Sequence, residues 1–217
     1  MNWAVAESPP TSGEASPDSL AYWISQNQNE EVRRLIKHGV DVNAADTSGD
    51  CPLIVAVNHS NWEAMRLLLE AGAKTNIRNS QGRTPLHLTV SKKSFDDTLD
   101  ARTLAAAKVL IAQGANVSDA TSYGETALYI ATYKRFNKMV ELLVESGANV
   151  NEEYFDNPGG YGLTPTLLAE DMGYPELAAY LRSKGGDINH GFVAKRAWKR
   201  ATGRILQVII APFYYRY

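Results

Sequence analysis

The feature of this sequence that most constrains its fold is a glycine that recurs at a fixed period. In five segments a glycine follows a short helical stretch and leads towards Asn or Ser: Gly39–Asn43, Gly72–Asn76, Gly114–Ser118, Gly147–Asn151 and Gly185–Asn189. Successive glycines are separated by 33, 42, 33 and 38 residues, which is a 33-residue period with two insertions. A period of this length predicts a repeat protein whose units stack on their neighbours.

Each unit has a second landmark, where a glycine opens a polar turn that leads into a helix. The four copies are Gly49-Asp-Cys-Pro-Leu, Gly82-Arg-Thr-Pro-Leu-His, Gly124-Glu-Thr-Ala-Leu-Tyr and Gly162-Leu-Thr-Pro-Thr-Leu. Thr84 suits the N-cap of a helix, and Pro85 suits the first helical position, where its missing N–H costs nothing. A second helix then carries an apolar stripe such as Ala64, Leu67 and Leu68, and it ends at the periodic glycine. Each unit is therefore expected to be a pair of short helices.

These motifs resemble the ankyrin repeat, whose Thr-Pro-Leu-His-x-Ala signature is almost intact at Thr84–Thr89. The sequence departs from the signature at Cys51, Ala127 and Thr166. The resemblance covers about residues 18 to 189. It implies an all-α repeat solenoid of about five stacked helix–turn–helix repeats, joined by finger turns that resemble β-hairpins.

The chain is expected to have three parts. Residues 1–17 are rich in Pro, Ser, Glu and Gly, which predicts a flexible leader. The repeats are expected at 18–43, 44–77, 78–118, 119–151 and 152–189, followed by a basic amphipathic helix and an aromatic tail at 190–217. The first repeat is incomplete, as expected of a terminal cap. The two insertions are expected between the helices of the third repeat, near 93–101, and in the fifth finger, near 152–161.

The resemblance implies a non-enzymatic adaptor or inhibitor that binds another protein through the finger turns and the concave face. The positions that the repeat pattern leaves free for a partner are Ser48, Asp50, His59, Gln81, Arg83, Tyr123, Glu125, Tyr133, Leu163 and Met172. An apolar surface joining Tyr123, Tyr133, Tyr161, Leu163 and Met172 would signal a protein interface. The alternative is that these are scattered apolar residues of an ordinary surface.

The insertion in the fifth finger adds three aromatic residues, Tyr154, Phe155 and Tyr161. Aromatic side chains are enriched at interface hot spots, so these residues are candidates for partner contact. The alternative is that they fold back on the fifth repeat.

No pattern in the sequence indicates catalysis, a cofactor or a metal site. The four histidines, His38, His59, His87 and His190, show no ligand spacing, and the resemblance gives His87 a structural hydrogen bond to the neighbouring turn. The single Cys51 cannot form an internal disulfide, and the chain has no apolar run of 18 residues. A monomer of the cytoplasm, or of the nucleus, is expected.

The last 28 residues have a composition that the repeat does not explain. They carry six basic and no acidic residues, a charge of +6, while the rest of the chain carries −8. On a helix, one apolar stripe would contain Ala194, Ala197, Trp198, Ala201, Ile205, Val208 and Ile209. Lys195, Arg196, Lys199 and Arg200 would lie opposite.

Three interpretations of this segment remain open. It is a helix that caps the fifth repeat, a helix that lies on an anionic membrane, or a partner motif such as a groove ligand or nuclear import signal. In the second case, residues 192–211 would anchor a peripheral membrane scaffold, and the candidate contacts in the last two are Lys195, Trp198, Lys199, Ile205 and Ile209. Specific nucleic-acid binding is not expected, because the body of the chain is acidic.

Overall fold

A computed structural model describes residues 16–92, 101–155 and 162–187 of the chain. These residues form ten helices: α1 (Pro17–Ser25), α2 (Asn29–Lys37), α3 (Pro52–Asn58), α4 (Trp62–Glu70), α5 (Pro85–Ser91), α6 (Ala101–Ala112), α7 (Ala127–Tyr133), α8 (Asn137–Glu145), α9 (Pro165–Asp171) and α10 (Pro175–Ser183). Within the described residues there is no named β-strand, so the predicted all-α repeat solenoid is confirmed.

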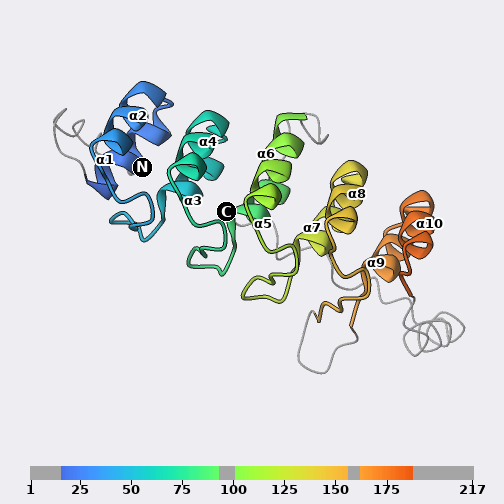
Figure 1. Ribbon diagram of the computed structural model, residues 1–217. Coiled ribbons are helices and arrows are strands. Elements are labelled where there is room, and N and C mark those ends of the chain that lie inside the picture. The colour runs from blue at the N-terminus through green and yellow to red at the C-terminus, as the bar shows by residue number, and fades with distance from the viewer. Residues whose placement is uncertain (1–15, 93–100, 156–161, 188–217) are drawn as a thin grey trace, which may run out of the picture.

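The helices form five pairs that stand in a row, from α1 and α2 at one end to α9 and α10 at the other (Figure 1). We call the odd-numbered helices inner and the even-numbered helices outer. Successive inner helices pack against each other, as do most successive outer helices. The loops between pairs all extend to one side of the row (Figure 1). We call these loops the fingers and define them as residues 44–50, 77–83, 119–125 and 152–163.

Three of the inner helices begin with the predicted threonine cap. The hydroxyls of Thr84, Thr126 and Thr164 accept hydrogen bonds from the backbone N–H three residues later, at 3.5, 3.2 and 3.3 Å. Cys51 holds the same N-cap position with an extended backbone, but its thiol makes no capping bond. The thiol instead donates to the carbonyl of Asn43 at 3.3 Å.

The outer helices end at the predicted glycines. Gly39, Gly72, Gly114, Gly147 and Gly185 all have φ between 81° and 91°. This left-handed conformation is one that residues with a Cβ rarely adopt, so the glycine turns the chain out of the helix.

A continuous apolar core runs the length of the row. Leu53, Leu86 and Leu128 occupy the same position on α3, α5 and α7, and each is fully buried. In α9 this position holds Thr166, which is also fully buried. Stacking therefore provides the burial that short helices cannot achieve alone.

The structure places some of the expected boundaries differently and leaves others undescribed. Helix α1 begins at Pro17, inside the segment expected as a leader, because Ser16 and Ser19 form a reciprocal capping box. The insertion expected near 93–101 falls between the end of α5 and the start of α6, and residues 93–100 are outside the described part. The tail at 190–217, with the contact candidates Lys195, Trp198, Lys199, Ile205 and Ile209, is also outside it.

Candidate protein-binding surface

The first three fingers share one hydrogen-bonded turn. A side-chain oxygen of Asp46, Asn79 or Thr121 accepts the backbone N–H groups two and four residues later, at 2.9 to 3.2 Å. The backbone N–H of the same residue donates to the carbonyl four residues later. These bonds use the backbone groups inside the turn and leave the side chains at its tip directed outwards. The fingers are thus preformed supports for surface residues.

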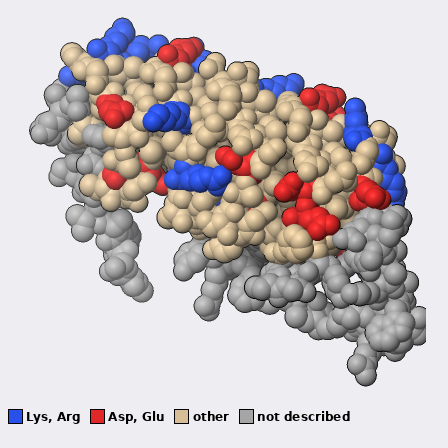
Figure 2. All heavy atoms as spheres, turned by 60° about the horizontal axis from the view of Figure 1, so that its bottom comes forward, with Lys and Arg blue, Asp and Glu red and all other residues tan. Residues whose placement is uncertain are grey.

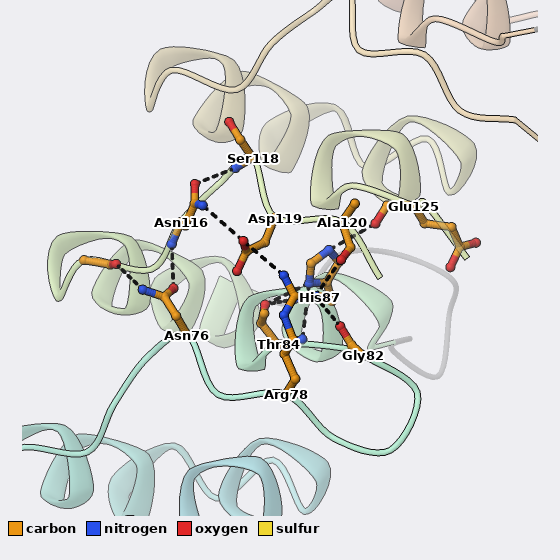
Figure 3. Close-up of polar contacts among 11 residues, drawn as sticks. Asn76, Arg78, Gly82, Thr84, His87, Asn116, Ser118, Asp119, Ala120 and Glu125 are labelled. Carbon is orange, nitrogen blue, oxygen red and sulfur yellow. Dashed lines mark hydrogen bonds and ion pairs between the residues drawn. The ribbon is translucent and has the colours of Figure 1, made fainter. Parts of the chain in front are cut away.

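Neighbouring units are tied together by the recurring asparagine. The amide groups of Asn43, Asn76 and Asn151 donate to the carbonyls of the next unit's turn glycine, at 3.4, 3.2 and 3.0 Å. Their side-chain oxygens accept the backbone N–H two residues after that glycine, at 2.8, 2.8 and 2.7 Å. Figure 3 shows the bond between Asn76 and Asn116.

The fourth unit lacks this tie, because Ser118 stands where the other units have asparagine. No hydrogen bond within the described residues joins the Ser118 side chain to the turn at Gly147, since a serine side chain is too short to make both bonds. We predict that Ser118→Asn raises the free energy of unfolding by about 1 kcal/mol, through two solvent-exposed hydrogen bonds. Urea unfolding measures the change.

The reverse substitution at the equivalent position provides the matched control. Asn76→Ser removes the two bonds that Asn76 makes, so it should destabilise the protein by a similar amount. If Ser118→Asn left the unfolding midpoint unchanged while Asn76→Ser lowered it, the tie would not transfer between units.

Arg78 makes a further connection between two fingers (Figure 3). Its Nη1 donates to the carbonyls of Gly82, at 2.9 Å, and Ala120, at 2.6 Å. Its Nη2 lies 3.1 Å from a carboxylate oxygen of Asp119. Sequence reasoning missed Arg78, because its role depends on where the next finger lies.

His87 makes the structural hydrogen bond that the resemblance implied. Its ring Nε2 lies 3.1 Å from the carbonyl oxygen of Glu125 in the next finger. Its Nδ1 lies 3.3 Å from the backbone nitrogen of Thr84 and 2.8 Å from the Thr84 hydroxyl (Figure 3). Burial lowers the pKa of the His87 imidazole below its ordinary value. The ring is therefore held neutral, with Nε2 as the donor and Nδ1 as the acceptor.

The thirteen residues expected on the partner surface differ in exposure. Those that lie exposed are Ser48, His59, Gln81, Tyr123 and Phe155. Those that are partly buried are Asp50, Arg83, Tyr133, Tyr154, Leu163 and Met172. Glu125 is buried, and Tyr161 lies outside the described residues. The exposed members cluster on the fingers, apart from His59 at the end of an inner helix.

Glu125 lies beneath the surface rather than on it. Its residue is only 4% exposed, and its carboxylate lies 3.9 Å from the Arg83 guanidinium of the preceding finger. Asp50, at the equivalent position two fingers earlier, has a raised pKa because of its partial burial and the nearby charge of Asp46. The residue that follows the finger glycine thus packs between fingers, which is a correction to the expected contact role of Glu125.

The aromatic residues of the fifth finger are divided between the two expected orientations. Tyr154 pairs with Leu163 through two backbone hydrogen bonds of 3.1 and 2.8 Å, and its ring centroid lies 4.2 Å from that of Tyr129. Tyr154 therefore folds back. Because successive side chains of an extended chain point to opposite sides, Phe155 points away from that contact and is 54% exposed.

Two lysines at the ends of inner helices link neighbouring repeats. Lys134 donates through Nζ to the carbonyl of Ser91, the last residue of α5, at 2.9 Å. Lys92 donates in the same way to the carbonyl of Asn58, the last residue of α3. A cation is favourable at a helix C-terminus, where carbonyls lack partners. These positions therefore support the stack rather than a partner.

The described residues contain no group of three or more His, Cys, Asp or Glu side chains that could hold a metal ion. Among the same residues, no helix combines the length and the apolar character that crossing a membrane requires.

Comparison with known families identifies the repeat. A family model for ankyrin repeats matches in three copies, over residues 20–99, 64–154 and 98–191. The chain belongs to the ankyrin repeat family. Ankyrin repeats are protein–protein interaction modules and are generally non-enzymatic, so the class of function expected from the sequence is confirmed at this level.

Three curated proteins of larger size are similar to this ankyrin array. The chain is 30% identical over 169 residues to the nuclear factor NF-kappa-B p105 subunit of Gallus gallus, covering 76% of this chain and 16% of that protein. It is 32% identical over 190 residues to the potassium channel AKT1 of Arabidopsis thaliana, covering 77% and 22%. It is 30% identical over 112 residues to the inactive serine/threonine-protein kinase TEX14 of Bos taurus, covering 50% and 7%. The chain thus spans less than a quarter of each of these relatives.

Proposed function

We propose that this ankyrin array acts as an adaptor or inhibitor, binding a partner protein at the fingers of its C-terminal half. The observation that carries the proposal is the exposure of two aromatic side chains on neighbouring fingers. Tyr123 is 63% exposed and Phe155 is 54% exposed. Among the described residues, Val109 on α6 is the one other large apolar side chain that is exposed, at 37%.

The two fingers that carry these aromatics are in close proximity. A methyl group placed on Gly124 would lie 4.0 Å from the ring of Tyr154, so the residues beside Tyr123 and Phe155 approach one another. The backbone under Tyr123 is held by two hydrogen bonds to Thr121, each of which spans 3.2 Å. Anchors on a preformed support lose little conformational entropy when they bind. Burying them in a partner would supply apolar contact area of the kind found at hot spots.

The surface around the fingers has the mixed character of a protein-binding face. Figure 2 shows that most of the described surface on this side is neither basic nor acidic. The Lys and Arg side chains in that view are interspersed with Asp and Glu rather than gathered in a strip. A nucleic-acid site would need clustered basic residues to neutralise phosphates. The mixed face therefore favours a protein as partner.

The proposal is tested by capturing partners with the full-length chain and with the double variant Tyr123→Ala, Phe155→Ala. Both side chains are exposed, so the variant should fold with nearly unchanged stability. We expect captured partners to bind the variant at least about 10-fold more weakly, as measured by titration calorimetry, because hot-spot aromatics contribute more than about 1 kcal/mol each.

Val109→Ala is the matched control, because it removes an exposed apolar side chain from an outer helix instead of a finger. It should leave the dissociation constant unchanged. Equal affinity of the double variant and the original chain for every captured partner would refute the assignment of this surface.

A further inference from the structure

The last inner helix, α9, is buried on a side where the described residues provide no further repeat. Leu167 and Leu168 are each 1% exposed, like the corresponding residues of inner helices that have a repeat on both sides. The described elements that pack against α9 are α7, on the preceding side, and α10, its own partner helix. Figure 1 shows α9 and α10 at the end of the row.

The position of Leu167 within its helix indicates which way it faces. Leu167 is the third residue of α9, as His87 is of α5 and Tyr129 is of α7. His87 bonds to the next finger, and the Tyr129 ring packs on Tyr154 of the finger after it. By the repeat geometry, Leu167 faces the place of a following unit. A residue facing that place is fully shielded only if something lies there.

The chain leaves the described structure at this same place. The carbonyl of Asp187 accepts a hydrogen bond of 2.9 Å from the Thr164 hydroxyl at the start of α9. Its backbone N–H donates to Asn151 Oδ1 at 2.7 Å. Asp187 is therefore fixed beside α9, and the residues that follow it begin next to the face that needs a cover.

The spacing of the repeats predicts where a following helix would begin. The N-cap residues Cys51, Thr84 and Thr126 each come eight residues after the turn residue, which is Asn43, Asn76 or Ser118. The same count from Asn189 reaches Ala197, so a helix would start at Trp198. From there Trp198, Ala201, Ile205 and Ile209 recur at helical spacing.

The segment nevertheless differs from a complete repeat. The finger glycine comes six residues after the turn residue in the first three fingers, but the residue six positions after Asn189 is Lys195. A terminal unit that has one apolar face and a polar outer face is what an array needs at its end.

We propose that residues 198–209 form a helix that docks on α9 and α10 and closes the array, with Trp198 and Ile205 covering the face around Leu167. The occupant is thus a segment of this chain, not an external partner. Its charge of +6 also complements the −8 of the rest of the chain. The basic side chains on the opposite face of the helix would remain in water.

Amide hydrogen exchange on the full-length chain tests the proposal. We expect amides of residues 200–209 to exchange far more slowly than in an unstructured peptide, and to lose that protection in Leu167→Asp. Val109→Asp, a charge placed on an exposed site of an outer helix, should leave their exchange unchanged. Exchange of residues 200–209 at the unstructured rate in the unmodified chain would overturn the proposal.

A double-mutant cycle tests the contact even if Leu167→Asp fails to fold. Leu167→Ala and Trp198→Ala should each lower the Tm, and the double variant should lower it by less than the sum, because the residues share one contact. Strictly additive shifts would contradict the contact.

Vesicles of phosphatidylserine and phosphatidylcholine distinguish the rival membrane interpretation. The docked helix predicts that full-length protein does not float with such vesicles, since its apolar stripe is already buried. Flotation that Trp198→Ala abolishes, together with fast exchange in solution, would assign the segment to a membrane surface and overturn the cap.

Discussion

Replacing His87 with alanine is expected to lower the free energy of unfolding by about 3 kcal/mol. The imidazole joins the start of α5 to the next finger through Thr84 and the carbonyl of Glu125. His87 is 1% exposed, so its removal leaves a cavity as well as buried backbone groups without partners. Urea unfolding followed by circular dichroism measures the loss.

His59→Ala is the control, because His59 is exposed at the end of α3. It should change the free energy of unfolding by no more than about 0.5 kcal/mol. Similar losses for the two variants would show that the bonds made by His87 do not stabilise the array.

The same histidine should make the stability depend on pH. Its pKa in the folded protein is lowered from the ordinary value of 6.5, mainly by burial, so below pH 6.5 the unfolded chain binds a proton that the folded protein does not. The contribution of His87 is therefore complete above pH 6.5, and it is lost progressively as the pH falls towards the folded pKa. His87→Gln should show a smaller loss of stability between pH 7.5 and 5.5 than the unmodified chain, and an equal loss would count against this explanation.

Gly82→Ala is expected to destabilise the protein by about 3 kcal/mol, for two reasons that add. Gly82 has φ of 69°, in the left-handed region that a Cβ disfavours. A Cβ at this position would also lie 2.7 Å from the backbone nitrogen of Ser122 in the next finger. That nitrogen donates to the carbonyl of Gln81 at 3.3 Å, so relief of the clash would break a bond between fingers. Thermal unfolding measures the change.

Gly49→Ala separates the two causes. Gly49 has φ of 83° in the equivalent turn, but a Cβ there would meet no atom within 4 Å. We expect a loss of about 1 kcal/mol, which reflects backbone conformation alone. If Gly49→Ala proved as costly as Gly82→Ala, contact between the fingers would not contribute.

Periodic local features could be predicted from the sequence because each one is repeated. The glycines at helix ends, the threonine caps and the role of His87 depend on residues a few positions away or on the identical unit that follows. Ser118 and Cys51 were recognised as substitutes at repeated positions. Only the structure showed that neither makes the bonds of the residue it replaces, because that depends on side-chain reach.

The candidate surface could be predicted only in part. Tyr123 and Phe155 were expected to be exposed and are, whereas Glu125 is buried and Tyr154 folds back on Tyr129. The repeat pattern shows which positions are free of a structural consensus. It does not show which of them a neighbouring finger covers.

The sequence by itself determined the fold class, the number of helix pairs among the described residues and the positions of their caps. These follow from a 33-residue period and from hydrogen bonds within one unit or between identical units. The tertiary structure alone decided the roles of Arg78, Lys92 and Lys134 and the burial of Glu125, since each depends on atoms about 34 to 43 residues away. The stacking of one finger on the next separates structural side chains from those available to a partner, and a linear pattern cannot contain that distance.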